Sequence, residues 1–181
     1  MNSRRQFLQQ GSFGLLPMVV PLSLFSNPTP DFEGVIVTEN EGEAFRLRDG
    51  RAVVKIKISK RQGPASMSVL TSTVATNDAI HIHKHLHEDE IFFIRQGTGL
   101  FTLGEKEHIV NAGALIFIPK GVWHGLKNTG TEEISTVFGY SPAGFEDFFK
   151  ELGTPADKPF VEKSTDERKA IAKRWGIVYK D

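Results

Sequence analysis

Four histidines alternate along one short segment of the chain, at His81, His83, His85 and His87. If this segment is a β-strand, all four imidazoles lie on one face, because successive side chains point to opposite faces. Neighbouring imidazoles are then about 6.6 Å apart, so an i, i+2 pair can share a metal ion through bonds of about 2.1 Å. His81 and His87 would be about 20 Å apart and cannot share an ion. One of the three neighbouring pairs is therefore expected to bind a metal.

An acidic residue stands close to this segment. Glu90 follows the polar residues His87-Glu88-Asp89 and begins the apolar run Ile91–Ile94, which predicts another strand. A carboxylate at the start of that strand can reach back across the turn toward the histidines. Imidazole and carboxylate together form a ligand set that suits first-row divalent metals.

Short strands must position these residues. Between residues 31 and 140, apolar or alternating segments are separated by Gly, Pro, Asn and Asp, a pattern typical of an all-β sandwich or barrel. The predicted strands are Val54–Ile58, Ser66–Val69, Ile91–Ile94, Gly99–Leu103, His108–Val110, Ala114–Ile118 and Ile134–Tyr140. So many short strands in about 110 residues predict an all-β, double-sheet jelly roll.

A helical pattern replaces the strands after residue 140. Four apolar residues have the i, i+3, i+4, i+7 spacing of one helix face: Phe145, Phe148, Phe149 and Leu152. Gly153 ends this pattern, and the capping box Ser164–Glu167 predicts a second helix that ends at Gly176. We expect the aromatic residues of this tail to pack against the outer sheet, with closure of the barrel mouth as the alternative.

Two segments resemble the paired motifs of the cupin superfamily. His83-x-His85-x₄-Glu90-x₆-Gly97 is similar to the first motif, and Gly113-x₅-Pro119-x-Gly121-x₂-His124-x₃-Asn128 to the second. The resemblance covers roughly residues 34–140. It implies a conical cupin jelly-roll barrel, here followed by a C-terminal α-helical extension, with a metal site inside the barrel.

Carried over position by position, the resemblance assigns four metal ligands: His83, His85, Glu90 and His124. It leaves three histidines outside the site: His81 as a rim residue that orients a ligand at best, His87 as a turn residue, and His108 as an ordinary surface residue. Three imidazoles and one carboxylate suit one divalent transition metal ion with open coordination positions, and Fe, Mn, Ni, Co, Cu and Zn all satisfy that description. The alternative is a metal-free barrel in which the histidines form a solvated polar face.

The enzyme hypothesis that fits this metal site best is a mononuclear-metal dioxygenase that acts on a small chelating enolic substrate, with Glu90 as the catalytic base. An aromatic substrate is implied by a resemblance of the tail. The tail, from Ser141-Pro142-Ala143-Gly144 to Trp175-Gly176-Ile177, resembles the C-terminal extension of small quercetin 2,3-dioxygenase-like cupins. Two alternatives stay open: a non-catalytic metal- or small-ligand-binding envelope protein, and a metal-assisted isomerase or decarboxylase.

A dioxygenase of this kind also requires an apolar substrate pocket. The candidate pocket residues are Phe92, Phe101, Phe117, Trp123 and Phe138. Their alternative role is plain barrel core, because aromatic residues dominate most cores.

The N-terminus has the layout of an export signal. Ser3-Arg4-Arg5-Gln6-Phe7-Leu8 resembles a twin-arginine signal, and an apolar run of about 15 residues follows, too short to span a bilayer comfortably. We therefore expect a signal peptide at residues 1–26, a cupin barrel at 27–140 and a helical extension packed on the barrel at 141–181. The expected partners are the twin-arginine export machinery and a small-molecule substrate, with a periplasmic or secreted location and no permanent membrane anchor.

Composition excludes several other functions. The 181 residues include 22 basic and 22 acidic side chains, and this balance argues against nucleic-acid binding. The chain has no cysteine, so disulfides, thiolate metal sites and cysteine nucleophiles are excluded. A homodimer is compatible with the cupin resemblance, although no residue of the sequence demonstrates it.

Overall fold

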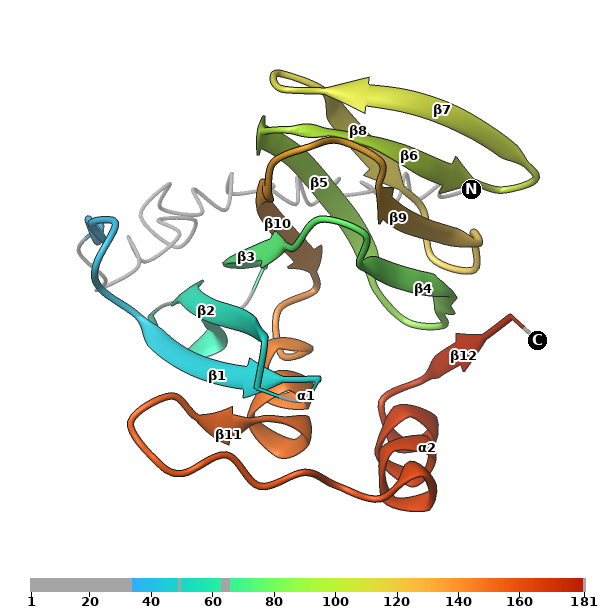
Figure 1. The fold of residues 1–181 in the computed structure, drawn as a ribbon. Helices are drawn as coiled ribbons and strands as arrows, with labels where there is room; N and C mark the ends of the chain where they lie inside the picture. Colours follow the sequence, from blue (N-terminus) through green and yellow to red (C-terminus); the bar gives the residue numbers. More distant parts are fainter. Residues whose placement is uncertain (1–33, 49, 63–65, 181) are drawn as a thin grey trace, which may run out of the picture. The chain divides into compact units, whose positions relative to one another are not determined.

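Twelve β-strands and two α-helices form the part of the chain that the structure describes (Figure 1). The computed structural model describes residues 34–48, 50–62 and 66–180, which belong to one compact unit, Phe32–Asp181. The strands are β1 (Glu43–Leu47), β2 (Ala52–Ile58), β3 (Ser68–Val74), β4 (Ala79–His85), β5 (Asp89–Gln96), β6 (Thr98–Leu103), β7 (Lys106–Asn111), β8 (Leu115–Ile118), β9 (His124–Asn128), β10 (Ile134–Ser141), β11 (Thr154–Pro155) and β12 (Ile177–Tyr179). The helices are α1 (Glu146–Leu152) and α2 (Thr165–Arg174), and a 3₁₀ turn spans Lys60–Gln62.

The strands form two antiparallel sheets. The larger sheet has the order β11-β1-β2-β3-β10-β5-β8, and the smaller sheet has the order β12-β4-β9-β6-β7. Strands far apart in the sequence pair directly, because β10 lies between β3 and β5. This double-sheet arrangement confirms the predicted all-β jelly roll with a helical C-terminal part.

Alternation of side chains decides which residues of each strand enter the core. In β5, Glu90, Phe92 and Ile94 are buried, whereas Ile91 and Phe93 point outward. The same alternation in β10 buries Ile134, Thr136, Phe138 and Tyr140. Alternate side chains of these strands therefore fill the interior between the sheets.

The histidine segment departs from the expected regular strand. β4 ends at His85, and Leu86 and His87 form a bend, so His87 does not continue the line of imidazoles. The pairing of β4 with β9 also shifts register between Ile80 and His83. The backbones approach closely at this shift, since a Cβ on Gly125 would lie 2.9 Å from the carbonyl oxygen of Ile80. His87 is therefore the turn residue that the sequence predicted, and the alternating strand ends at His85.

The two tail helices form where the sequence predicts them. The Ser164 hydroxyl accepts a hydrogen bond from the backbone N–H of Glu167, whose carboxylate accepts from the N–H of Ser164, so the capping box is complete. Gly153 caps the end of α1. Gly176 follows α2 with a φ of 67°, in the left-handed region that favours glycine.

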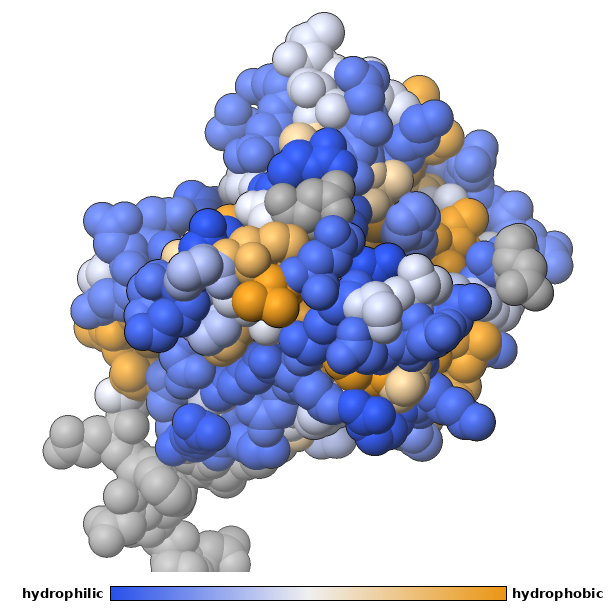
Figure 2. Space-filling view, turned by 60° about the horizontal axis from the view of Figure 1, so that its bottom comes forward, coloured by the Kyte–Doolittle hydropathy of each residue, from blue (hydrophilic) through white to orange (hydrophobic). Residues whose placement is uncertain are grey.

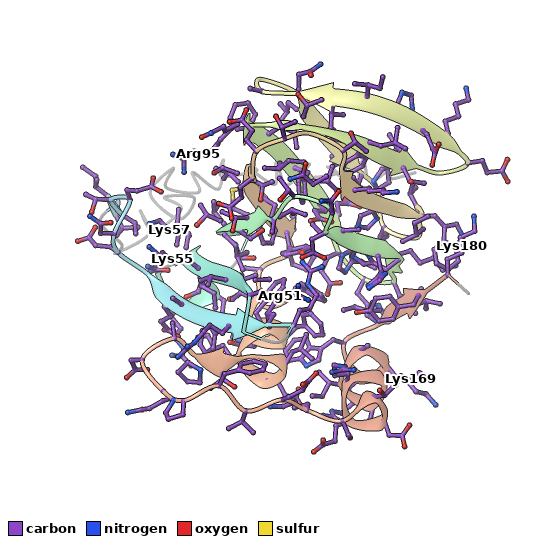
Figure 3. The ribbon with its side chains drawn as sticks, in the orientation of Figure 1. Arg51, Lys55, Lys57, Arg95, Lys169 and Lys180 are labelled. Carbon is purple, nitrogen blue, oxygen red and sulfur yellow. The ribbon has the colours of Figure 1, made fainter. Side chains whose placement is uncertain are left out.

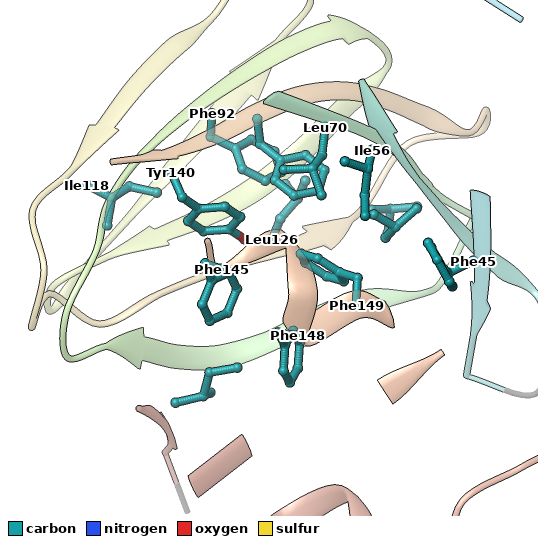
Figure 4. Packing of buried hydrophobic residues seen from close by; sticks show 14 of the residues in the cluster. Phe45, Ile56, Leu70, Phe92, Ile118, Leu126, Tyr140, Phe145, Phe148 and Phe149 are labelled. Carbon is teal, nitrogen blue, oxygen red and sulfur yellow. The ribbon is translucent and has the colours of Figure 1, made fainter. Parts of the chain in front are cut away.

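Aromatic residues of α1 pack inside the fold rather than on its outer surface. The ring of Phe145 lies 4.5 Å from that of Tyr140 and 4.5 Å from that of His85, between ring centroids. In Figure 4, Phe145, Phe148 and Phe149 gather with Phe92 and Tyr140 in one cluster. The expected packing against the outer sheet was thus wrong, because the tail closes one end of the space between the sheets.

The predicted signal peptide, residues 1–26, lies outside the residues that the structure describes. Within residues 34–48, 50–62 and 66–180, no helix has the length and apolar character needed to cross a membrane.

Candidate metal centre

Three strands bring four potential metal ligands together. His83 and His85 come from β4, and His124, the first residue of β9, pairs directly with His83. Glu90 comes from β5 of the other sheet. The four side chains that the sequence predicted as ligands therefore meet in the space between the sheets.

The ligand atoms of these residues converge on one point. The Nε2 atoms of His83 and His85 are 3.2 Å apart, and an Oε2 atom of Glu90 lies 3.0 Å from His124 Nε2 and 3.5 Å from His85 Nε2. Two ligands at right angles on one ion, each with a bond of about 2.1 Å, lie about 3 Å apart. The spacing is thus the one that a shared metal ion requires.

Backbone carbonyls orient two of the imidazoles. The Nδ1 atom of His83 lies 2.8 Å from the carbonyl oxygen of His81, and the Nδ1 atom of His124 lies 3.0 Å from that of Val122. With Nδ1–H donating to a carbonyl, Nε2 keeps its lone pair and faces the other ligands. His81 therefore contributes its backbone to the centre, while its exposed side chain lines the adjoining cavity.

Burial and mutual contact set the charge of these groups. Burial, followed by the neighbouring charges of His124 and His85, lowers the pKa of His83 to about 3. Burial raises the pKa of Glu90, but its close contacts with His124 and His85 outweigh burial and bring the pKa down to about 2. Burial lowers the pKa of His124, and Glu90 raises it by more. Glu90 is thus ionised and His83 is neutral at pH 7, the forms that bind metals.

The donor set fits a divalent first-row metal ion. Three imidazole nitrogens lie within 4.8 Å of one another, and one carboxylate oxygen completes the group. Glu90 Oε2 and His124 Nε2 are buried without an aligned hydrogen-bond partner among the described residues. Buried polar atoms ordinarily have partners, and a metal ion would satisfy both of these.

A cavity of about 740 Å³ adjoins the metal centre. It is lined by all four ligands and by three of the predicted pocket residues, Phe92, Phe101 and Phe138. The other two predicted pocket residues, Phe117 and Trp123, do not line the cavity. Phe117 points outward from β8 and is 60% exposed, because the strand alternates and its neighbour Ile118 is buried. Trp123 lies beneath the amine of Lys84, 4.5 Å from the ring centroid.

The sequence missed two tyrosines whose rings lie beside the centre. Tyr140 lies against His85, with ring centroids 5.1 Å apart, and burial together with the charge of Glu90 raises its pKa well above the ordinary value. The ring of Tyr179 lies 6.0 Å from that of His83, because β12 pairs with β4 in the register Tyr179 to His83. The alternation of β10 predicts that the side chain of Tyr140 points inward, so this residue could have been found from the sequence. No local sequence pattern predicts β12.

Three comparisons show what this chain resembles. An uncharacterized protein of Methanocaldococcus jannaschii is 27% identical over 115 residues, which cover 62% of this chain and 92% of that protein. An oxalate-binding protein of Thermotoga maritima is 34% identical over 56 residues, 31% of this chain and 46% of that protein. The solved structure of a predicted oxalate decarboxylase from Thermotoga maritima has a TM-score of 0.54 at 22% identity, covering 60% of this chain and 99% of that one.

The family comparison agrees with the fold and with the position of the histidines. Residues 70–140, which include all four ligands, match the family described as the cupin domain. The two antiparallel sheets around the ligand group are the architecture that such a domain requires. The chain therefore has the cupin fold, and residues 70–140 are the part of it that matches the cupin domain.

Proposed function

We propose that this chain is a metal-dependent cupin enzyme that acts on a small chelating aromatic or enolic substrate, as a mononuclear-metal dioxygenase. The observation that carries the proposal is the contact between the ligand group and an aromatic-lined cavity of about 740 Å³. Sites that bind organic molecules of moderate size have cavities of about 300–1,000 Å³ with mostly apolar walls. A site built only to hold a metal ion would not need such a space.

The residues around the centre have distinct roles in this proposal. His83, His85 and His124 would hold the metal ion, which supplies Lewis acidity and open positions for a chelating substrate. Glu90 would also bind the ion, and its carboxylate is the candidate acceptor for the proton that an enolic hydroxyl loses. Tyr140 lies opposite Glu90 across β10 and β5, and the rings of Phe92 and Phe138 keep water from the substrate.

A decarboxylase or a carboxylate-binding protein is the second candidate. It is favoured by the likeness to an oxalate-binding protein, which spans 56 residues. Oxalate has only two carbons, however, and would leave most of the cavity filled with water. The cavity therefore favours a larger substrate than oxalate.

Oxygen uptake tests the proposal. Protein reconstituted with Fe, Mn, Ni or Co is mixed with flavonols, diketones, catechols and oxalate in an oxygen electrode. We expect uptake with at least one aromatic or enolic compound, and its loss in Glu90→Gln with the metal still bound. Glu105→Gln, at an exposed turn residue, is the matched control and is expected to keep full uptake.

Two results would contradict the dioxygenase proposal. Metal-loaded protein that consumes no oxygen but releases carbon dioxide from oxalate would be a decarboxylase. Metal-loaded protein that binds these compounds and converts none would be a binding protein.

A further inference from the structure

The exposed part of the cavity lining carries more positive than negative charge. Six basic residues line the cavity, against three acidic residues. The basic residues are Arg48, Arg51, Lys163, Arg168, Lys169 and Lys180. Glu90, one of the acidic residues, belongs to the buried metal centre. None of the six basic residues is buried, so the positive charge lies at the mouth of the cavity, where a ligand enters.

Neighbouring acids compensate only part of this charge. Arg48 pairs with Asp78 at 3.3 Å, and Arg168 pairs with Glu162 at 3.1 Å. Lys169 and Lys180 form no ion pair within the part of the chain that the structure describes. These two amines are therefore available to an anionic ligand.

The C-terminal part of the chain carries both lysines, and the backbone of Lys180 lies beside the strand that carries two of the metal ligands. Lys169 lies on α2 and Lys180 directly follows β12, as Figure 3 shows. The backbone N–H of Lys180 donates to the carbonyl of Ile82 on β4 at 3.0 Å. The backbone of Lys180 thus has a fixed position relative to the ligands on β4.

The interior of the cavity is apolar, in contrast to its charged mouth. Its walls near the centre are aromatic, including Phe92, Phe138 and Phe149, and these side chains belong to the buried cluster. The face viewed in Figure 2 is mainly hydrophilic, with hydrophobic residues in small patches. A ligand that matches both parts has an apolar body and a charged end.

We propose that the ligand of this cavity is an organic anion whose aromatic or aliphatic body lies between the phenylalanines and whose carboxylate faces the basic residues of the mouth, to which Lys169 and Lys180 belong. The inference rests on the proposed function for the chelating end of the ligand. It adds the class of the substrate: a chelating compound with a second, anionic group at the far end. Exposed lysines attract such a group over a distance of about 10 Å at moderate ionic strength, which favours both entry and orientation.

A pair of probes that differ only in charge tests the inference. Dihydrocaffeate and its methyl ester share a chelating catechol and a short chain, but only the acid is anionic at the mouth. Both are titrated by calorimetry into zinc-loaded protein, because zinc does not change its redox state. We expect the acid to bind about tenfold more tightly at low salt, since each exposed charge contributes modestly, and the preference to shrink at high salt.

The double variant Lys169→Glu with Lys180→Glu is expected to lose the preference for the acid. Lys106→Glu is the matched control: this lysine is exposed on β7 and does not line the cavity. Thermal melting compares the folding of both variants with that of the unaltered chain. Equal Kd values for acid and ester in the unaltered chain, or a preference that survives in the double variant, would overturn the inference.

A second pair of probes separates this inference from the proposed function. Phenylpropionate and phenylpropanamide lack a chelating group, and ligand-detected NMR follows their binding to metal-free protein. Preference for phenylpropionate, with no binding of either catechol to the zinc-loaded chain, would support the anionic mouth and contradict the chelating function. Binding of both catechols with equal Kd would support the chelating function and contradict the anionic mouth. No binding of any probe would overturn both.

Discussion

At the scale of single residues, the choice among the histidines depends on backbone contacts as well as on spacing. Alternation alone left three imidazole pairs equivalent. In the structure, His83 lies opposite His124 across β4 and β9, and its Nδ1 contacts the carbonyl of His81. His87 leaves the strand at a bend. The motif resemblance identified the same pair, but neither the bend nor the carbonyl contact could be predicted from spacing.

His124→Ala is expected to abolish stoichiometric metal binding. It removes a ligand from the converging group, and loss of one of three or four ligands weakens a metal site by orders of magnitude. His108→Ala is the control, because His108 is exposed on β7. Elemental analysis of protein dialysed against metal would measure both. A full equivalent of metal on His124→Ala would show that the centre does not use this residue.

The two strands that flank β5 allow a test of the aromatic side chains. Phe138→Ala, in the buried cluster on β10, is expected to lower the free energy of unfolding by about 3–5 kcal/mol, since it leaves a cavity. Phe117→Ala, on the outward face of β8, is expected to lower it by less than about 1 kcal/mol. Urea unfolding measures both. Equal losses would mean that Phe117 is buried in solution, for example against a second copy of the chain.

At the scale of elements, the sequence predicted those that carry a local signal. α2 has a capping box and β5 has a short apolar run, and both form. β1, β9 and β12 were missed, because each is short and its pairing depends on strands far away in the chain. β9 matters most, since it brings His124 to His83. The pairing of strands far apart in the chain cannot be recognised from one segment of sequence, whereas a helix cap or an alternating pattern can.

Ser164→Ala is expected to destabilise α2 and the strand that follows it. The substitution removes the acceptor for the N–H of Glu167, and loss of an N-cap residue costs about 1 kcal/mol. Ser164→Asp keeps an acceptor and is expected to retain most of the stability. Chemical denaturation gives the difference between the two variants. If both lose the same amount, the cap does not stabilise the helix.

At the scale of the whole molecule, the cavity is the feature least visible in the sequence. Its walls come from both sheets and from the tail, including Phe92, Phe138 and Phe145. The sequence predicted the first two from their strands. It misplaced the tail aromatics, because an amphipathic helix does not reveal which surface its apolar face will meet. The fold and the ligand group thus followed from local patterns and motifs, whereas the cavity required the packing of segments far apart in the chain.

The predicted signal peptide would connect the export of the chain with the choice of its metal. We propose that residues 1–26 direct the chain through the twin-arginine route, which carries folded proteins, so that the centre is filled before export. Affinity order alone would favour copper or zinc for a nitrogen-rich site. Filling in the cytoplasm would instead retain manganese, iron or nickel. Protein recovered from the native envelope is therefore expected to contain one of these three metals.

Replacing residues 1–26 by a leader that exports unfolded chains tests this order of events. The same centre would then meet its metal outside, and copper or zinc is expected in place of the original ion. Arg4→Lys with Arg5→Lys is the control for the route, and it is expected to keep the chain in the cytoplasm. Elemental analysis of each fraction gives the result. The same metal after both routes would contradict cytoplasmic filling, and export of the double lysine variant would contradict the twin-arginine route itself.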